Sequence, residues 1–203
     1  YLEILTLIRD SEKVLVMRIF LLALILFFGL QSWTKADDIR DFQIEGMSIG
    51  DSALDYYSKS IIKSNKTDLG YKDDKFYGVL INIKSNKFDQ IQLHFKTNDI
   101  NYKIHAIGGI KGFNNNIDNC YSLKKEIELD IRNLFKNAKF FDQGKLKHPG
   151  DKSGKSFVTQ AFYSLDNGVV SIACYDLAKE FNSDFRLIVN SNEINEWYNV
   201  AYN

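Results

Sequence analysis

Cysteine and proline are scarce in this 203-residue sequence, which contains two cysteines and one proline. The cysteines do not form a Cys-x-x-Cys motif, so a dithiol redox centre is not indicated. An excess of one charge is also lacking. The sequence has 26 basic and 26 acidic residues, and four of the basic and three of the acidic ones precede Asp37, so the remainder has a formal charge of −1. Because proteins that bind nucleic acids usually have a basic excess, this balance argues against that class.

A long apolar run is lacking as well. The apolar run at residues 19–30 is shorter than the about 20 residues that a membrane-spanning helix needs. It follows Met17 and Arg18 and precedes a polar stretch ending at Ala36, an order typical of a secretory signal peptide. We therefore predict a signal peptide over residues 17–36, and an uncleaved N-terminal membrane anchor is the alternative. No cysteine directly follows the run, which excludes a lipid-modified N-terminal cysteine.

The other segments define the domain organisation. Residues 1–16 begin without methionine and mix apolar with charged residues, so we interpret them as an extension of the gene prediction. Residues 37–203 are enough for a single globular domain with a substantial core.

Hydrophobic periodicity predicts an alternation of helices and strands in this domain. Helices are predicted from residue 53 to 61, from 120 to 136 and from 192 to 201. Strands are predicted at residues 42–44, 76–83, 88–97, 102–107, 157–165, 168–175 and 185–189. The glycine-rich stretch 108–116 and residues 140–155 are predicted to be loops, and Asn167-Gly168 is a strong hairpin-turn signal. The prediction is an α+β fold, mainly antiparallel sheet with helices on one face. Its order is α-βββ-α-βββ-α, which suggests a duplicated α-βββ unit without any repeat at the residue level.

Two serines near the start of the domain match hydrolase motifs. Residues 46–50 have the G-x-S-x-G pattern of a nucleophile elbow around Ser48, and Gly50-Asp51-Ser52 is similar to the opening block of GDS-type esterases. The elbow needs a sheet upstream that so short a preceding segment does not provide. The esterase needs an Asp-x-x-His motif to activate its serine, and none of the histidines has an aspartate three residues before it. We therefore interpret Ser48 as a helix N-cap with Asp51 completing the capping box. A serine hydrolase using Ser48 or Ser52 is the alternative.

A basic segment follows the second predicted helix. Residues 149–156 end like a phosphate-binding P-loop, but Pro149 occupies the position of the first glycine, and the next segment is extended rather than helical. Nucleotide binding is therefore not indicated. A flexible basic loop remains as a candidate contact site for an anionic partner or lipid headgroup, and a solvated connection is the alternative. Its candidate residues are Lys145, Lys147, His148, Lys152 and Lys155.

Histidines and cysteines are the remaining candidates. His94 and His105 lie opposite each other if Phe95 pairs with Ile104, and the alternation then places both on the exposed face. Two imidazoles are too few for a zinc site, so no metal or other cofactor is predicted. Cys120 lies on the apolar stripe of its helix. Cys174 shares a strand face with apolar residues. Because both face the core of an exported protein, a disulfide is predicted, with two buried thiols as the alternative.

Several of these segments resemble a known family. The signal peptide and residues 44–52, 71–77 and 147–156 are similar to those of a family of small exported proteins from AT-rich marine alphaproteobacteria that has no assigned activity. A fainter similarity is to outer-membrane lipoproteins of the SmpA/OmlA type, where a Gly-Met-Ser/Thr turn opens a helix before three strands.

The resulting functional prediction is a periplasmic, non-catalytic binding or interaction domain of the cell envelope. The expected partner is an envelope protein or an anionic ligand, and nucleic acid is not expected. A monomer is predicted, in contact with the membrane only through the N-terminal segment if this is not cleaved. A purely structural envelope protein is a further alternative.

Overall fold

The computed structural model describes residues 38–113, 116–178 and 182–201. The chain divides into two units between residues 35 and 36, and the described residues belong to the second, Ala36–Asn203. The predicted signal peptide at residues 17–36 and the extension at residues 1–16 lie outside the described residues. No helix in the described part of the chain has the length and apolar character needed to span a bilayer.

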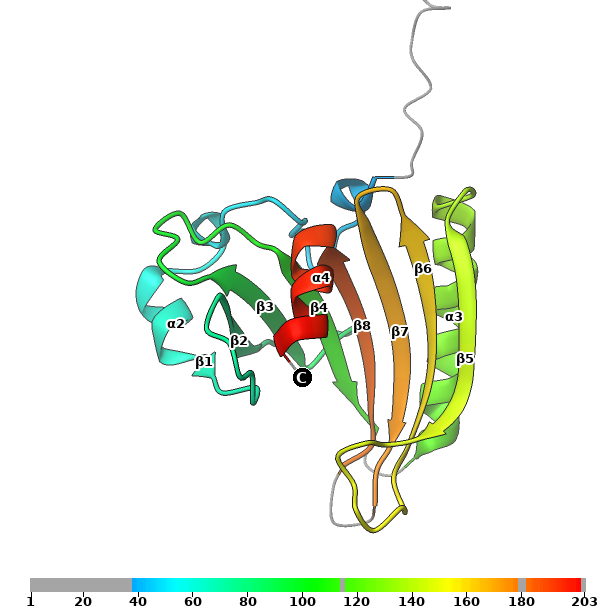
Figure 1. The fold of residues 1–203 in the computed structure, drawn as a ribbon. Helices are drawn as coiled ribbons and strands as arrows, with labels where there is room; N and C mark the ends of the chain where they lie inside the picture. Colours follow the sequence, from blue (N-terminus) through cyan, green and yellow to red (C-terminus); the bar gives the residue numbers. More distant parts are fainter. Residues whose placement is uncertain (1–37, 114–115, 179–181, 202–203) are drawn as a thin grey trace, which may run out of the picture. The chain divides into compact units, whose positions relative to one another are not determined.

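An eight-stranded antiparallel sheet is the framework of the second unit (Figure 1). Its strand order is β1-β2-β3-β4-β8-β7-β6-β5, so consecutive strands form each half of the sheet and the pairing of β4 with β8 joins the halves. The prediction of an α+β fold with mainly antiparallel sheet is confirmed. The strands are β1 (Lys66–Thr67), β2 (Phe76–Asn82), β3 (Gln90–Lys96), β4 (Ala106–Gly112), β5 (Lys139–Lys147), β6 (Phe157–Leu165), β7 (Gly168–Asp176) and β8 (Asp184–Ser191). The helices are α2 (Lys59–Ser64), α3 (Ile117–Leu134) and α4 (Asn192–Ala201), with 3-10 turns η1 (Ile39–Asp41) and η2 (Ala53–Asp55).

The two longer helices lie on opposite faces of the sheet, α3 behind it and α4 in front of it in Figure 1. Side chains alternate between the faces along each strand. On the α3 side, residues such as Leu187 and Val189 of β8 belong to the main core. This core also includes apolar residues of the segment at residues 39–53. On the α4 side, Trp197 packs in a smaller cluster with Phe76 and Ala106. The prediction that the helices share one face is therefore wrong, because each face of the sheet carries apolar residues that need cover.

The predicted glycine-rich loop 108–116 is largely strand, because β4 extends to Gly112. Gly109 faces the α3 side, where a Cβ atom would lie 2.6 Å from the ring of Phe88. The absence of a side chain at Gly109 lets this ring lie flat on the sheet, so the glycine serves close packing rather than a turn.

The predicted loop 140–155 is also shorter in the structure, because β5 occupies Lys139–Lys147 at the edge of the sheet. Most of its residues are exposed, so the strand lacks the alternation that marks a half-buried strand. The register shifts between Asp142 and Gly144, a bulge that, together with the lysines of β5, is typical of edges protected against pairing with other chains.

The helix predicted at residues 53–61 is replaced by η2 and α2, which are capped by Ser52 and Ser58. Ser48 is not a helix cap. Its backbone N–H donates to the Asp51 carboxylate at 2.9 Å, so half of the predicted capping box forms around a turn instead. The hydroxyl of Ser191, which directly precedes α4, is buried and has no hydrogen-bond partner within the described residues.

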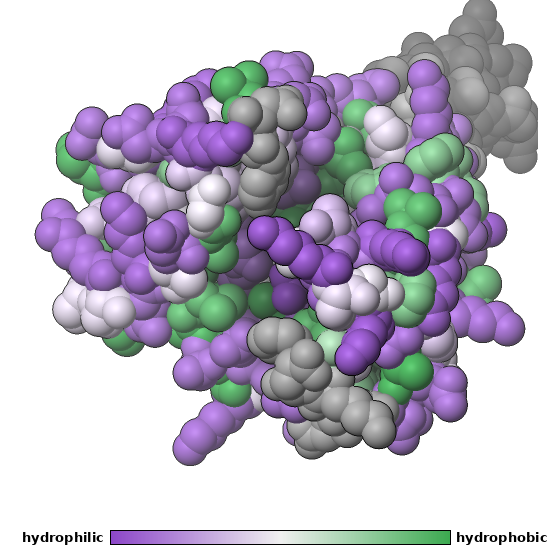
Figure 2. Space-filling view, turned by 60° about the horizontal axis from the view of Figure 1, so that its bottom comes forward, coloured by the Kyte–Doolittle hydropathy of each residue, from purple (hydrophilic) through white to green (hydrophobic). Residues whose placement is uncertain are grey.

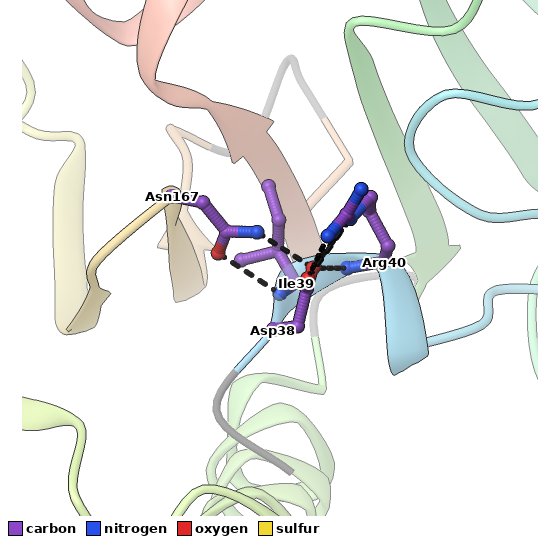
Figure 3. A network of polar contacts seen from close by, with 4 residues as sticks. All are labelled: Asp38, Ile39, Arg40 and Asn167. Carbon is purple, nitrogen blue, oxygen red and sulfur yellow. Dashed lines mark hydrogen bonds and ion pairs between the residues drawn. The ribbon is translucent and has the colours of Figure 1, made fainter. Parts of the chain in front are cut away.

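The predicted Asn-Gly hairpin joins β6 and β7, with Leu165 paired to Gly168. Asn167 has a second role, shown in Figure 3: its side chain accepts from the Ile39 N–H (3.2 Å) and donates to the Asp38 carboxylate (2.6 Å). Hydrogen bonds from Arg40 hold the pKa of Asp38 well below its usual value. The turn thus fastens the start of the folded unit, where Ile39 is fully buried.

Candidate functional site

The two cysteines form a disulfide that joins α3 to β7. The Sγ atoms of Cys120 and Cys174 are 1.98 Å apart, and the Cα atoms are 5.9 Å apart. Both side chains are fully buried in the main core. The predicted inward orientation of both residues is therefore confirmed, and the disulfide lies beneath the helix that borders one of the grooves described below.

The predicted basic loop connects β5 to β6, and its candidate residues differ in what they contact. Lys145 is on β5, forms an ion pair with Asp176 (3.2 Å) and lies 4.6 Å from the ring centre of Phe157. The other three lysines, Lys147, Lys152 and Lys155, are exposed and make no ion pair within the described residues. The end of β5 and the loop after it therefore carry three cationic groups that form no ion pair within the described residues.

The loop is folded around its own acid. The Asp151 carboxylate accepts hydrogen bonds from the backbone N–H groups of Ser153 (2.8 Å), Lys155 (3.1 Å) and Ser156 (2.7 Å). Hydrogen bonds from Ser153 and Ser156 hold the pKa of Asp151 well below its usual value. In a P-loop, backbone N–H groups surround a phosphate. Here they donate to the carboxylate of Asp151, and the side chains of Lys152 and Lys155 are exposed.

A pocket of about 400 Å³ lies between this loop and the α4 side of the sheet. Its lining residues are His148, Gly150, Asp151, Ser156, Tyr175, Leu177 and Arg186. The surface turned forward in Figure 2 is mainly hydrophilic, with hydrophobic residues in small separate patches.

His148 and Arg186 are the cationic or donor groups of this pocket. His148 Nδ1 accepts from the Gly150 N–H (3.2 Å), so the proton of the neutral ring is on Nε2, which has no hydrogen-bond partner in the described residues. The Arg186 guanidinium stacks 4.2 Å from the ring centre of Tyr175 and pairs with Asp184 at 2.8 Å. The pocket thus brings His148 and Arg186 together with the Asp151 carboxylate. Arg186 was not identified as a site residue from the sequence. Strand alternation predicts which residues share a face of β8, but only the topology shows which other segments lie beside that face.

His94 and His105 are buried, with exposed fractions of 1% and 8%, so the prediction that both are exposed is wrong. His94 pairs with Ala106 rather than with His105, and its Nε2 lies 2.8 Å from the Tyr71 hydroxyl. His105 Nδ1 lies 3.6 Å from a carboxylate oxygen of Glu193 on α4. The alternating pattern identified the correct face for His94, but α4 covers that face. The described residues contain no group of three or more His, Cys, Asp or Glu side chains placed to hold a metal ion.

Burial of His94 predicts a pH-dependent stability. It lowers the pKa of His94 to about 4, against about 6.5 in the unfolded chain. Below pH 6.5 the unfolded chain therefore binds a proton that the folded protein does not, and stability falls as the pH falls toward 4. For one proton the loss amounts to about 3 kcal/mol. Burial also lowers the pKa of His105, which adds to the loss.

Urea unfolding at several pH values checks this expectation. His94→Gln should flatten the dependence between pH 6.5 and 4 relative to the wild type. An identical pH dependence in His94→Gln and the wild type would show that His94 is not its source.

The two candidate serines contact backbone groups rather than histidines. Ser48 Oγ donates to the Phe42 carbonyl (3.2 Å), and Ser52 Oγ donates to the Asn101 carbonyl (2.7 Å). Ser48 is in the segment that packs on the α3 side, whereas His94 faces α4. In the described part of the chain, the arrangement therefore does not bring either serine together with a histidine that would act as a general base.

The comparisons with known proteins give no match: no family model, no curated protein and no solved structure is similar to this chain at a significant level.

Proposed function

We propose that the protein is a periplasmic, non-catalytic binding domain of the cell envelope that recognises an anionic, phosphate-like group through the loop at residues 148–156. The observation that supports it most is a set of three lysines beside the His148 pocket, Lys147 at the end of β5 and Lys152 and Lys155 in the loop, which make no ion pair within the described residues. Like-charged groups held at one site attract anions and raise their local concentration.

The loop is suited to binding because its backbone is already ordered. The three hydrogen bonds to Asp151 hold the loop in one conformation before a ligand arrives. A preordered loop loses less conformational entropy on binding than a flexible one. The lysines can then contact an anion above the pocket while His148 Nε2 donates from within it.

The disulfide supports the proposed compartment. Disulfides persist in oxidising environments such as the bacterial periplasm and are rare in the cytosol. The Cys120–Cys174 bond therefore agrees with export by a signal peptide at residues 17–36.

The fold also supports the proposal of a duplicated unit, in a form that differs from the predicted order. Within the described residues, a helix precedes four consecutive strands in each half of the sheet, α2 before β1–β4 and α3 before β5–β8. The strand order is symmetrical about the β4–β8 pair.

The binding proposal is tested by reversing the charge of the loop. Lys152→Glu/Lys155→Glu should weaken binding to vesicles of phosphatidylglycerol and phosphatidylcholine by at least about tenfold, because each basic residue near an anionic surface contributes about 1 kcal/mol. The control is Lys63→Glu/Lys84→Glu, which changes the net charge equally at exposed positions elsewhere. Titration with inorganic phosphate distinguishes a free anion from a membrane surface.

Loss of binding in the loop variant alone supports the proposal. Equal loss in both variants, unchanged binding in the loop variant, or no binding of the wild type to either probe would contradict it.

A further inference from the structure

A second groove lies on the α3 side of the sheet, away from the basic loop. It has a volume of about 420 Å³ and is bordered by α3, the segment at residues 42–45 and the turn at residues 86–88. The two sites lie on opposite faces of the sheet. Arg186 of β8 lines the loop pocket, and the next residue, Leu187, lines this groove.

The floor of the groove is apolar and held in place by packing. Phe88 lies against Gly109, and Leu187 contributes from the sheet. Phe42 is half-buried at one wall, with its ring centre 5.9 Å from that of Phe135. The floor is therefore formed by rigid side chains of the core.

A hydrogen bond at one end of the groove connects the segment at residues 42–45 to the β2–β3 connection. The turn that begins with Glu45 (φ +52) and Gly46 (φ +80) is closed by reciprocal backbone hydrogen bonds between Ile44 and Met47. This turn places the Glu45 carboxylate where the Ser85 hydroxyl donates to it at 2.6 Å. The wall formed by residues 42–45 is thus fixed to the β2–β3 connection.

The α3 wall carries unpaired acids. Leu123 and Ile127 are half-buried and face the groove, and Glu126 and Asp130 line its rim one helical turn apart. Neither acid makes an ion pair within the described residues, whereas the neighbouring Glu128 is engaged by Lys124. The helix therefore presents two free negative charges beside an apolar surface.

The opposite wall carries charges of both signs, because Glu45 lies there with two lysines. Lys87 is exposed and has no ion pair in the described part of the chain, and Lys111 Nζ donates to the Asn86 carbonyl at 3.0 Å. The two unpaired acids of α3 beside an apolar floor match a ligand that carries a positive charge next to an apolar group. A polypeptide segment meets this requirement, because charged side chains can flank an apolar one.

We propose that this groove binds an extended segment of a partner protein. An apolar side chain of the segment enters between Phe42 and Ile127, and a basic side chain beside it faces Glu126 and Asp130. The volume is at the lower end of the range for ligand pockets and suits one or two side chains rather than a whole helix. The inference does not depend on the anion site, which lies on the other face of the sheet.

The test uses peptides blocked at both ends. Acetyl-Lys-Phe-Leu-Lys-amide is titrated into the purified protein, and binding is followed by the chemical shifts of backbone amides. We expect saturable shifts at residues of α3 and of the turn at residues 86–88. Acetyl-Glu-Phe-Leu-Glu-amide tests the charge requirement, and acetyl-Lys-Ser-Ser-Lys-amide tests the apolar requirement. Both should bind at least about threefold more weakly.

The matched variants separate the groove from general electrostatics. Glu126→Gln/Asp130→Asn should weaken binding of the lysine-containing apolar peptide by about threefold to tenfold, as expected for two exposed ion pairs. Asp55→Asn/Glu196→Gln makes the same charge change elsewhere and should leave binding unchanged. No saturable binding, shifts confined to other surfaces, equal affinity of the three peptides, or equal weakening in both variants would overturn the proposal. None of these outcomes bears on the lysines of the loop.

Discussion

Replacing Cys120 and Cys174 together by alanine is expected to lower the free energy of unfolding by about 4 kcal/mol. The disulfide links residues 54 positions apart. On the chain-entropy model, closing a loop of this length lowers the entropy of the unfolded chain and thereby stabilises the folded protein by about 4 kcal/mol. The bond also connects α3 to β7 within the main core. Its loss should therefore weaken the attachment of the helix that forms one wall of the peptide groove.

Urea unfolding of the oxidised protein and of the double variant measures the difference. The reduced wild-type protein is the control, since it keeps both sulphur atoms and loses only the covalent link. A decrease below about 1 kcal/mol in both would show that the crosslink contributes little. A large decrease in the free energy of unfolding of the alanine variant alone would show that the effect comes from the lost packing of the sulphur atoms.

Replacing Trp197 by alanine should cost about 3–5 kcal/mol, the usual range for removing a large buried aromatic side chain. Trp197 is 5% exposed and holds α4 on the sheet. Its ring centre lies 4.7 Å from that of Tyr71 and 5.1 Å from that of Phe76, and its indole N–H donates to Asp73 at 2.7 Å. The variant should therefore release α4 and expose the face that α4 covers.

Two measurements distinguish release of α4 from a general loss of stability. Amide hydrogen exchange in α4 should accelerate in Trp197→Ala. The pH dependence attributed to His94 should decrease, because an exposed imidazole regains an ordinary pKa. Trp197→Phe keeps most of the ring and should cost only about 1 kcal/mol, the value of a single hydrogen bond. Protected α4 amides in Trp197→Ala would contradict the role assigned to this side chain.

The parts of the fold that were predicted correctly depend on local patterns. The Asn167-Gly168 turn and its flanking strands were predicted closely, because turn geometry and alternation act over neighbouring residues. The helix α3 was predicted from its apolar stripe, and the same stripe placed Cys120 toward the core. For these elements the local signal and the tertiary packing agree.

The incorrect predictions share a different cause. Gly109 suggested a loop, but its lack of a side chain serves the packing of Phe88. The strand β5 has exposed residues on both faces and therefore no alternation to read. His94 is on the face that was expected, but a helix distant in sequence buries it.

The sequence by itself determined the antiparallel α+β class, the disulfide and the hairpin of β6 and β7, because hydrophobic period, turn chemistry and residue type act locally. Only the tertiary structure decided that α3 and α4 cover opposite faces, that Asp151 orders the loop and that Arg186 lines its pocket. The peptide groove is likewise a product of topology, since it brings Phe42, Phe88 and Ile127 together from three separate segments. Contacts between residues far apart in the chain depend on which strands pair and which face each helix covers, and no local pattern carries that information.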